Sequence, residues 1–416
     1  MMRKIQITVF SVLIALVFTC CKPDRPVYQP VGASQIHIGA LLSLTGSGMS
    51  TGRATQVSLE MARLDIQDYL TSLGIHKTVT LDVADTRTDT TEALKQLKLM
   101  YDKGVRLVIG PYSSAEVAAL KNFADTHGML VVSPSSVAVS LAIPGDNIFR
   151  FVSSDVIQGE AMSKMLTDDK IKVIVPLVRD DLWGNDLMEV VRRDFVKAGG
   201  IVQTPLKYTP GTTVFSGLLS RMDSTVAAVL DHQNPNEVAV YLLSFGEGTA
   251  ILGMARKYEH LNNVYWYGGS AFAGNTSVMA DTNATLFAYT HGLPCPVYGL
   301  DDAAKDKWQS LKNRIQSQLG RPPEVYAYTA YDALWVGVLT YTSTGPSPGI
   351  ELMKSAFVNV AANFFGASGN TLLDENGDRA SGNYDFWAVK HDTSGYNWKR
   401  VAKYNSSTGT LTRIAE

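Results

Sequence analysis

From residue 35 onward, short apolar runs alternate with stretches in which apolar residues recur every three or four positions. The short runs are typical of buried strands, and the wider spacing is typical of amphipathic helices. The segment 52–65, for example, places Ala54, Val57, Met61 and Leu64 on one helical face. The first half contains strands predicted at 36–42, 79–84, 105–109 and 130–133, with helices at 52–65, 89–97 and 116–127. This order predicts a doubly wound parallel α/β sheet.

The same alternation restarts after residues 149–159. Strands are predicted at 173–177, 201–208, 238–243 and 264–267, with helices at 185–198 and 248–258. A helix near 303–319, an apolar stretch at 327–340 and strands at 384–390 and 401–404 follow. The chain is long enough for more than one packed unit. We therefore expect a second lobe with the same architecture as the first.

The first 21 residues differ from the rest of the chain. Arg3 and Lys4 precede an apolar run at 5–18 that is shorter than a membrane span, and Cys20 and Cys21 follow at once. This pattern resembles a bacterial lipoprotein signal at 1–21, with a Pro-containing tether at 22–33. Lipidation at either Cys20 or Cys21 would anchor an exported chain at the periplasmic side or the cell surface. The alternative is an ordinary cleaved signal with incidental cysteines.

Charge and motif content exclude several classes of function. The net charge of −2 gives neither a nucleic-acid footprint nor a polybasic membrane surface, so we expect membrane contact only through the lipid anchor. The seven histidines form no metal-ligand spacing, and the sequence has no nucleophile elbow or phosphate loop. The 374–378 segment begins like a calcium loop, but Arg379 replaces the required glycine, which favours a tight turn. We predict no catalysis, no metal and no cofactor.

Small hydroxyl residues follow three predicted strands of the first lobe, at 43–48, 110–114 and 133–136. The carboxyl ends of parallel strands form the ligand crevice of such sheets, and helix N-termini there favour anions. In the second lobe, Trp183, Phe245 and Glu247 follow strands, and the two aromatic rings could enclose a ligand. The alternatives are serine capping of helices and ordinary aromatic packing.

These loops resemble those of the type I periplasmic binding proteins, specifically the branched-chain amino-acid-binding class that serves ABC importers. The resemblance covers about 350 residues and is carried by IHIGALLSLTG at 36–46, VIGPYSS at 108–114, VSPSS at 132–136, FRFVSSD at 149–155, YTAYDA at 328–333 and DENGDR at 374–379. It implies two doubly wound lobes joined by a hinge of three crossovers. Lobe one would contain residues 34–152 and 294–372, and lobe two residues 155–290 and 384–416.

The resemblance also implies the ligand-binding residues. The serine loops would hold the ligand carboxylate, and aromatic residues would line the cleft. We predict binding by Thr51, Tyr112, Ser113, Ser114, Ser135, Ser136, Trp183, Phe245, Glu247, Ser270 and Tyr326. Amino-acid binders of the class place a carboxylate for the ligand ammonium where Ser270 stands. Serine cannot supply that charge, so the sequence leaves the ligand open between an amino acid with Glu247 as its carboxylate partner, a related small acid or amide, and an aromatic compound.

The predicted function is capture of a small polar ligand by hinge closure and its delivery to an ABC permease. We expect a monomer and no nucleic-acid partner. The alternative with the same fold is a lipoprotein that acts as a ligand sensor or as a protein–protein regulator of cell-envelope enzymes.

Overall fold

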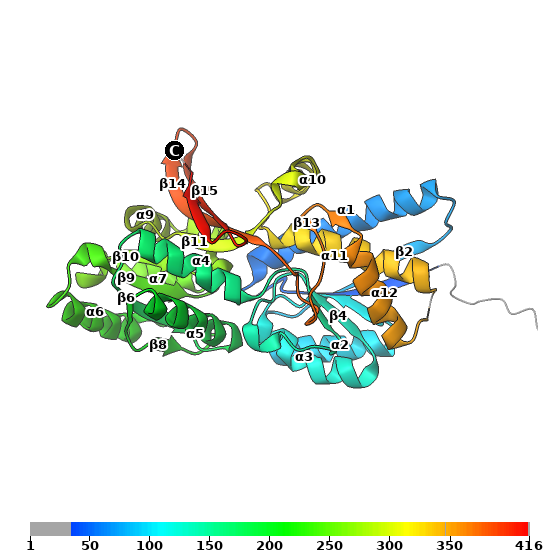
Figure 1. Ribbon diagram of the computed structural model, residues 1–416, viewed down its shortest axis with the longest axis horizontal. Helices are drawn as coiled ribbons and strands as arrows, with labels where there is room; N and C mark the ends of the chain where they lie inside the picture. The colour runs from blue at the N-terminus through cyan, green and yellow to red at the C-terminus, as the bar shows by residue number, and fades with distance from the viewer. Residues whose placement is uncertain (1–34, 346, 415–416) are drawn as a thin grey trace, which may run out of the picture. The chain divides into compact units, whose positions relative to one another are not determined.

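The computed structural model describes residues 35–345 and 347–414 (Figure 1). The predicted signal peptide, tether and lipidation cysteines Cys20 and Cys21 lie outside the described residues. None of the helices in the described part is both long and apolar enough to cross a membrane. Cys295, the cysteine within the described part, is buried and unbridged.

The first sheet is parallel, with strand order β2-β1-β3-β4-β5, and carries helices on both faces. Successive side chains of a strand point to opposite faces of the sheet, so each face packs against its own helices. Ile38 and Ala40 of β1 pack with α1, α11 and α12, whereas Leu41 packs with α2 and α3. The elements are β1 (Gln35–Leu42), α1 (Met49–Ser72), β2 (Thr78–Asp85), α2 (Thr90–Asp102), β3 (Leu107–Ile109), α3 (Ser114–His127), β4 (Leu130–Ser133), β5 (Ile148–Arg150), α11 (Tyr326–Thr344) and α12 (Ile350–Ala362).

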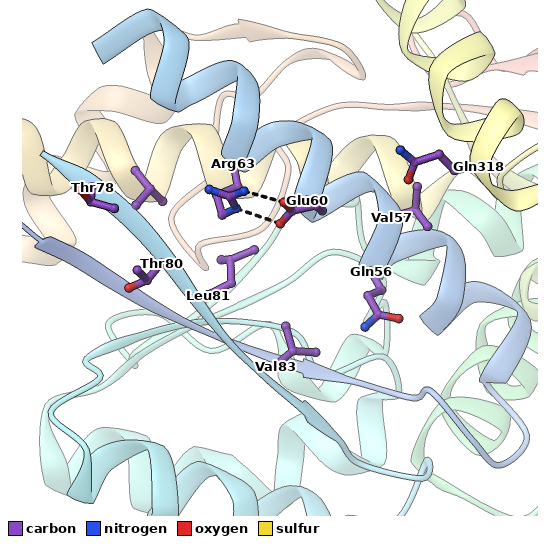
Figure 2. Close-up of a pocket in the computed structure, with 10 residues that line it drawn as sticks. Gln56, Val57, Glu60, Arg63, Thr78, Thr80, Leu81, Val83 and Gln318 are labelled. Carbon is purple, nitrogen blue, oxygen red and sulfur yellow. Dashed lines mark hydrogen bonds and ion pairs between the residues drawn. The ribbon is translucent and has the colours of Figure 1, made fainter. Parts of the chain in front are cut away.

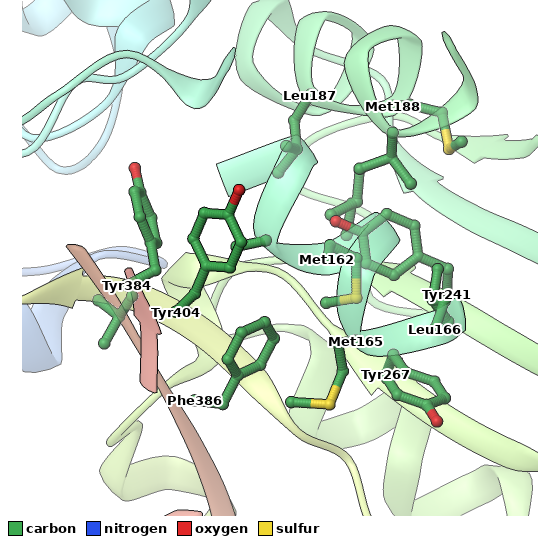
Figure 3. Close-up of a cluster of buried hydrophobic side chains, with 14 of the residues drawn as sticks. Met162, Met165, Leu166, Leu187, Met188, Tyr241, Tyr267, Tyr384, Phe386 and Tyr404 are labelled. Atoms are coloured by element: carbon green, nitrogen blue, oxygen red, sulfur yellow. The ribbon is translucent and has the colours of Figure 1, made fainter. Parts of the chain in front are cut away.

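The second sheet is also parallel, with order β10-β9-β6-β7 and β8 paired to β6. Successive side chains of its strands also point to opposite faces of the sheet. Figure 3 shows the core between this sheet and helices α4 and α5, where Tyr241 packs near Met162 and Leu187. The elements are α4 (Asp155–Asp168), β6 (Val173–Arg179), α5 (Leu182–Lys197), β7 (Ile201–Val202), β8 (Leu206–Tyr208), α6 (Ser216–Leu230), β9 (Val238–Leu243), α7 (Gly248–Ala255), β10 (Tyr265–Gly268), α8 (Thr276–Ala280) and α9 (Thr282–His291). The predicted α/β fold with two doubly wound parallel sheets is confirmed.

A third, antiparallel sheet has the order β11-β14-β15-β16. It contains β11 (Cys295–Gly299), β14 (Asn383–Asp392), β15 (Gly395–Asn405) and β16 (Thr410–Arg413), while α10 (Lys305–Leu319) packs on α1 and β12 (Phe365–Gly366) pairs with β13 (Gly369–Asn370). The positions of the hinge crossovers and the lobe limits stay a prediction.

A buried ion pair joins the end of β5 to the 374–379 turn. Arg150 at the end of β5 contacts Asp378 through two guanidinium nitrogens, and the two side chains are 1% and 2% exposed. Asp378 lies in the predicted tight turn, where the Asp374 carboxylate accepts the N–H groups of Asn376 and Asp378 at 2.9 and 3.0 Å. The turn is confirmed, and its aspartates serve the fold.

Several element limits differ from the prediction. The first helix runs from Met49 to Ser72, longer than 52–65, and the predicted strand 201–208 is divided into β7 and β8. Pro205 stands at that break, and proline cannot donate to a strand ladder. Short 3₁₀ helices occupy Val139–Leu141, Pro235–Glu237, His260–Asn262, Ser270–Phe272 and Asp302–Ala304.

Candidate functional site

Two of the predicted serines meet at the carboxyl ends of β3 and β4. The hydroxyl oxygens of Ser114 and Ser136 lie 2.9 Å apart, and both side chains are buried. The Ser114 hydroxyl also accepts the N–H groups of Val137 at 3.3 Å and Ala138 at 3.2 Å. Ser114 opens α3, so a helix N-terminus, a favourable position for an anion, lies beside this pair.

The side chains of the other two serines, Ser113 and Ser135, form hydrogen bonds with nearby loop and helix residues. The Ser113 hydroxyl donates to the Glu116 carboxylate at 2.6 Å and accepts the Glu116 N–H at 3.3 Å, which forms a capping box at the start of α3. The Ser135 hydroxyl donates to the Tyr112 carbonyl at 2.8 Å. Helix capping, the alternative reading of the serine loops, therefore accounts for Ser113. Ligand contacts of both serines stay a prediction.

Aromatic residues that follow strands of both sheets meet at one place. The Phe245 ring, after β9, lies 5.1 Å from the Trp183 ring at the start of α5 and 5.4 Å from the Tyr112 ring after β3. The Tyr112 ring is in turn 6.4 Å from that of Tyr326 at the start of α11. Trp183, Phe245 and Tyr326 are at most 5% exposed. Four of the predicted residues thus form one aromatic cluster.

Hydrogen bonds also join the two sets of loops. The Gly246 N–H donates to the Ser47 carbonyl at 3.3 Å, and the hydroxyls of Ser50 and Thr276 lie 2.9 Å apart. These contacts connect the start of α1 with loops of the second sheet. Small polar residues of this kind carry no motif, which is why the sequence did not point to them.

In this conformation the aromatic side chains fill the site. A space of about 10 Å³ remains beside Ser43, Thr51, Tyr112 and Ser135, which is room for about one water molecule. The Tyr112 ring packs so closely on Gly48 that a Cβ atom there would lie 2.7 Å from it. Burial raises the pKa of Tyr112 well above its ordinary value, and Tyr326 and Glu324 add to this effect. A ligand must therefore displace Tyr112 or enter as the loops separate.

Glu247 belongs to a charged group beside the aromatic cluster. One carboxylate oxygen contacts Arg179 and accepts the Tyr208 hydroxyl at 3.1 Å, while the other is buried without a partner among the described residues. Arg179 also donates to Asp181 at 2.5 Å and stacks 4.4 Å from the centre of the Phe245 ring. One guanidinium thus faces the carboxylates of both Glu247 and Asp181.

Ser270 and Tyr326 complete the predicted set. Ser270 begins the 3₁₀ helix after β10, is 3% exposed, and hydrogen-bonds the Tyr326 side chain. Burial raises the pKa of the Tyr326 phenol, which keeps it neutral. The two residues join the end of the second sheet to α11.

Asp155 and Gln158 were not among the predicted residues, and their surroundings are unusual. Both are 0% exposed, and none of their side-chain oxygen and nitrogen atoms has a partner in the described part of the chain. Asp155 stands in the FRFVSSD motif, which the sequence analysis used only as part of the family resemblance. The burial of Asp155 becomes visible only in the structure.

A larger groove lies elsewhere. About 550 Å³ is enclosed between α1 and the edge strand β2, lined by Gln56, Val57, Glu60, Arg63, Thr78, Val79, Thr80, Leu81, Val83 and Gln318 (Figure 2). On the α1 side of this groove, the Arg63 guanidinium pairs with Glu60 at 2.6 Å. None of its residues comes from the strand ends that carry the serine and aromatic loops, so the groove is separate from the candidate site.

The sequence model of the receptor family ligand-binding region matches residues 54–392. The chain belongs to this family. An uncharacterised protein of Methanocaldococcus jannaschii is 26% identical over 395 residues, which covers 90% of this chain and 91% of that protein. The Leu/Ile/Val-binding protein BraC3 of Rhizobium johnstonii is 25% identical over 266 residues, covering 62% and 71%.

Solved structures show the same fold as this member of the receptor ligand-binding family. A leucine-binding protein, LivK, of Thermotoga maritima superposes with a TM-score of 0.75 at 22% identity, covering 90% of this chain and 99% of that one. A solute-binding protein of Rhodopseudomonas palustris in complex with benzoate gives a TM-score of 0.69 at 17% identity, covering 92% and 98%. The chain is accordingly a member of the receptor ligand-binding family with the fold of the substrate-binding proteins of ABC transporters.

Proposed function

We propose that this chain captures a small carboxylate-bearing solute between the loops of its two parallel sheets and delivers it to an ABC importer. The relatives support this choice of ligand. BraC3 is named as a Leu/Ile/Val-binding protein, and structural neighbours are described in complex with isoleucine and with benzoate. Each of these ligands carries a carboxylate next to an apolar group. That combination suits serine hydroxyls beside aromatic rings.

The observation that carries the proposal is the serine pair. Two hydroxyls 2.9 Å apart at the N-terminus of α3 can each turn to donate to one carboxylate. Nearby backbone N–H groups of Val137 and Ala138 now bond Ser114 and could follow the new acceptor. Val137 supplies no hydroxyl of its own, so the binding of the carboxylate depends on these donors.

Closure is proposed to occur by rotation at the crossovers. Opening would break the Ser47–Gly246 and Ser50–Thr276 hydrogen bonds and separate Tyr112 from Phe245. A ligand that touches both sets of loops favours the closed form by its differential affinity. The closed form would be what the permease recognises.

Export and anchoring belong to the same proposal. Acylation of Cys20 or Cys21 would hold a monomeric binding protein at the outer side of a membrane, within reach of a permease. Replacing each cysteine by serine separately, with fractionation of the expressing cells, identifies the acylated one. The variant that loses its anchor moves to the soluble fraction. If both single variants and the double variant stay bound to the membrane, the anchor is not there.

A thermal-shift panel tests the binding function. The full mature chain is heated with each of the twenty standard amino acids and with small aliphatic and aromatic acids. A ligand at a hundred times its Kd adds about 2.7 kcal/mol to the free energy of unfolding. We expect at least one carboxylate to raise the melting temperature. If no compound does so, the solute-binding proposal fails and the protein-regulator function takes its place.

A further inference from the structure

Arg179 is a buried cation beside the aromatic cluster of the candidate site. It is the last residue of β6, and its side chain is 6% exposed. The guanidinium lies 4.4 Å from the centre of the Phe245 ring, which follows β9. A cation within about 6 Å of an aromatic face is attracted to it, and the planar guanidinium also stacks on rings. Arg179 therefore gives the Phe245 ring a charged surface to pack against.

Two carboxylates hold the guanidinium in that place. Its Nε donates to Asp181 at 2.5 Å, and one of its terminal nitrogens contacts Glu247. The other Asp181 oxygen accepts the Gly184 N–H at 2.9 Å and caps α5. Asp181 is thus bound to the helix as well as to Arg179, which limits the movement of both side chains.

Glu247 is also held by Tyr208, the last residue of β8. The Tyr208 hydroxyl donates to the Glu247 oxygen that contacts Arg179, at 3.1 Å. The same hydroxyl lies 2.8 Å from that of Ser244, directly after β9. All of these contacts join strand ends and loops of the second sheet, so the group would stay assembled when the loops of the two sheets separate.

Phe245 is the ring at which the two sheets meet. Besides Arg179, its neighbours are the Trp183 ring at 5.1 Å and the Tyr112 ring at 5.4 Å. For a ligand to enter, Tyr112 must move or the loops must separate. Phe245 then loses its contact with the first sheet, and Arg179 and Trp183 remain to fix its orientation.

A purely structural role is the competing explanation, because buried ion pairs occur in many folds away from any site. The chain offers a comparison. Arg106 stacks 4.1 Å from the centre of the Tyr101 ring, and its guanidinium donates to the carbonyls of Tyr101 at 3.0 Å and Val105 at 2.8 Å. Tyr101 belongs to α2 and lies outside the aromatic cluster. The stack on Phe245 differs because its ring belongs to the candidate site.

We propose that Arg179 is a positioning residue of the solute-binding site. It fixes the orientation of Phe245 before the ligand arrives, without touching the ligand itself. The inference rests on the proposed function, because it takes the ligand to lie against this ring. Preorganised side chains favour binding, since less rotational freedom is lost when the complex forms. Removing Arg179 should therefore weaken binding through Phe245.

The experiment is a double-mutant cycle between Arg179 and Phe245. Dissociation constants are measured by calorimetry for L-isoleucine, for benzoate and for the carboxylate that gives the largest thermal shift. The full mature chain is compared with Arg179→Met, Phe245→Leu and the double variant. Arg106→Met is the matched control, since it removes a stack of the same kind away from the site. Circular dichroism reports whether each variant is folded.

We expect Arg179→Met to raise the Kd at least about fivefold, because the Phe245 ring must then be ordered at the moment of binding. In the Phe245→Leu background the same change should alter the Kd less than about twofold, since the ring that Arg179 positions is absent. Arg106→Met should leave the Kd unchanged. An equal loss of affinity from Arg179→Met in both backgrounds, or no loss in either, would overturn the inference and leave the solute-binding function standing.

Arg179→Lys decides the question if Arg179→Met does not fold. Lysine keeps the positive charge between Asp181 and Glu247 but has no planar group to stack on the ring. It should raise the Kd at least about threefold when Phe245 is present and less than about twofold in Phe245→Leu. Equal effects in the two backgrounds would refute the positioning role. Absence of binding of every probe to the unmodified chain would instead refute the proposed function, and the inference with it.

Discussion

The rings of Tyr112 and Phe245 lie 5.4 Å apart at an interplanar angle of 61°. Tyr112 follows β3 of the first sheet, and Phe245 follows β9 of the second, so this edge-on contact joins strand ends of both sheets. The aromatic cluster around it is where the proposed ligand must displace protein atoms. Contacts of this cluster should therefore determine affinity.

Replacing Trp183 by alanine should weaken ligand binding by well over about tenfold, because a large aromatic side chain buries much area at little entropic cost. Trp183 is 3% exposed and lies 5.1 Å from the Phe245 ring. Calorimetric titration with the compound that gives the largest thermal shift measures the change. Tyr289→Ala, at a ring that is 45% exposed on α9, serves as the control and should leave the affinity unchanged.

Ser114→Ala and Ser113→Ala form a matched pair at the start of α3. The Ser113 hydroxyl is committed to Glu116, so its loss should cost about 1 kcal/mol of stability as a missing cap and change the Kd less than about threefold. Ser114→Ala removes a hydroxyl of the proposed carboxylate site and should raise the Kd more than about tenfold. Equal affinities in the two variants would show that the ligand does not reach Ser114.

Asp155→Asn should raise the melting temperature of the ligand-free protein at neutral pH. Burial raises the pKa of Asp155 well above its ordinary value, so ionisation at pH 7 opposes folding. Stability from this group is fully present below its unfolded pKa of about 3.9 and is lost as pH rises through the folded pKa. The advantage of the Asn variant should therefore shrink toward pH 4. The groups that act on Asp155 or respond to it are Arg150, Asp186, Tyr241, Tyr326 and Tyr384.

Asp332→Asn is the control for that experiment. Asp332 is also 0% exposed, but its carboxylate accepts the N–H groups of Ala367 and Ser368, each at 2.7 Å. Its replacement should lower the melting temperature, since an amide cannot accept all of these bonds. A melting temperature that falls equally in both variants would mean that Asp155 is a satisfied structural group.

The Arg150–Asp378 ion pair should be essential to the junction between β5 and the 374–379 turn. Removing one partner of a buried pair leaves an uncompensated charge and typically costs about 3–5 kcal/mol. Asp378→Asn should accordingly lower the free energy of unfolding by that order in a denaturant titration. Asp302→Asn breaks a pair with Lys403 in which Asp302 is 61% exposed, and it should cost less than about 1 kcal/mol. Similar effects of both changes would contradict the role given to Arg150.

Hydrophobic periodicity predicted the two parallel sheets well because strand and helix periods differ clearly in this chain. The predicted start of the helix at 89–97 agrees with α2, where the Asp89 carboxylate caps the helix by accepting the Glu92 N–H at 2.8 Å. Periodicity gave no assignment for α4, α6, α9 or α12. The weak amphipathicity of α4, which buries Asp155, Gln158 and Ser163 along with its apolar residues, explains why that helix left no clear pattern.

The candidate site was predictable only in part. Position after a strand located Ser114, Ser136, Trp183 and Phe245, because strand ends of one sheet must converge. It could not distinguish a serine that caps a helix from one that is free for a ligand, since both occupy the same place, as Ser113 shows. Nor could it detect that Glu247 is paired with Arg179, because 68 residues separate them in the sequence.

A crystal structure of the full mature chain with the compound that gives the largest thermal shift tests the central claim most directly. The account predicts a ligand carboxylate within about 3.2 Å of the Ser114 and Ser136 hydroxyls, with the rest of the molecule against Trp183 or Phe245. A ligand held by residues of one sheet alone, or seated in the groove between α1 and β2, would contradict it.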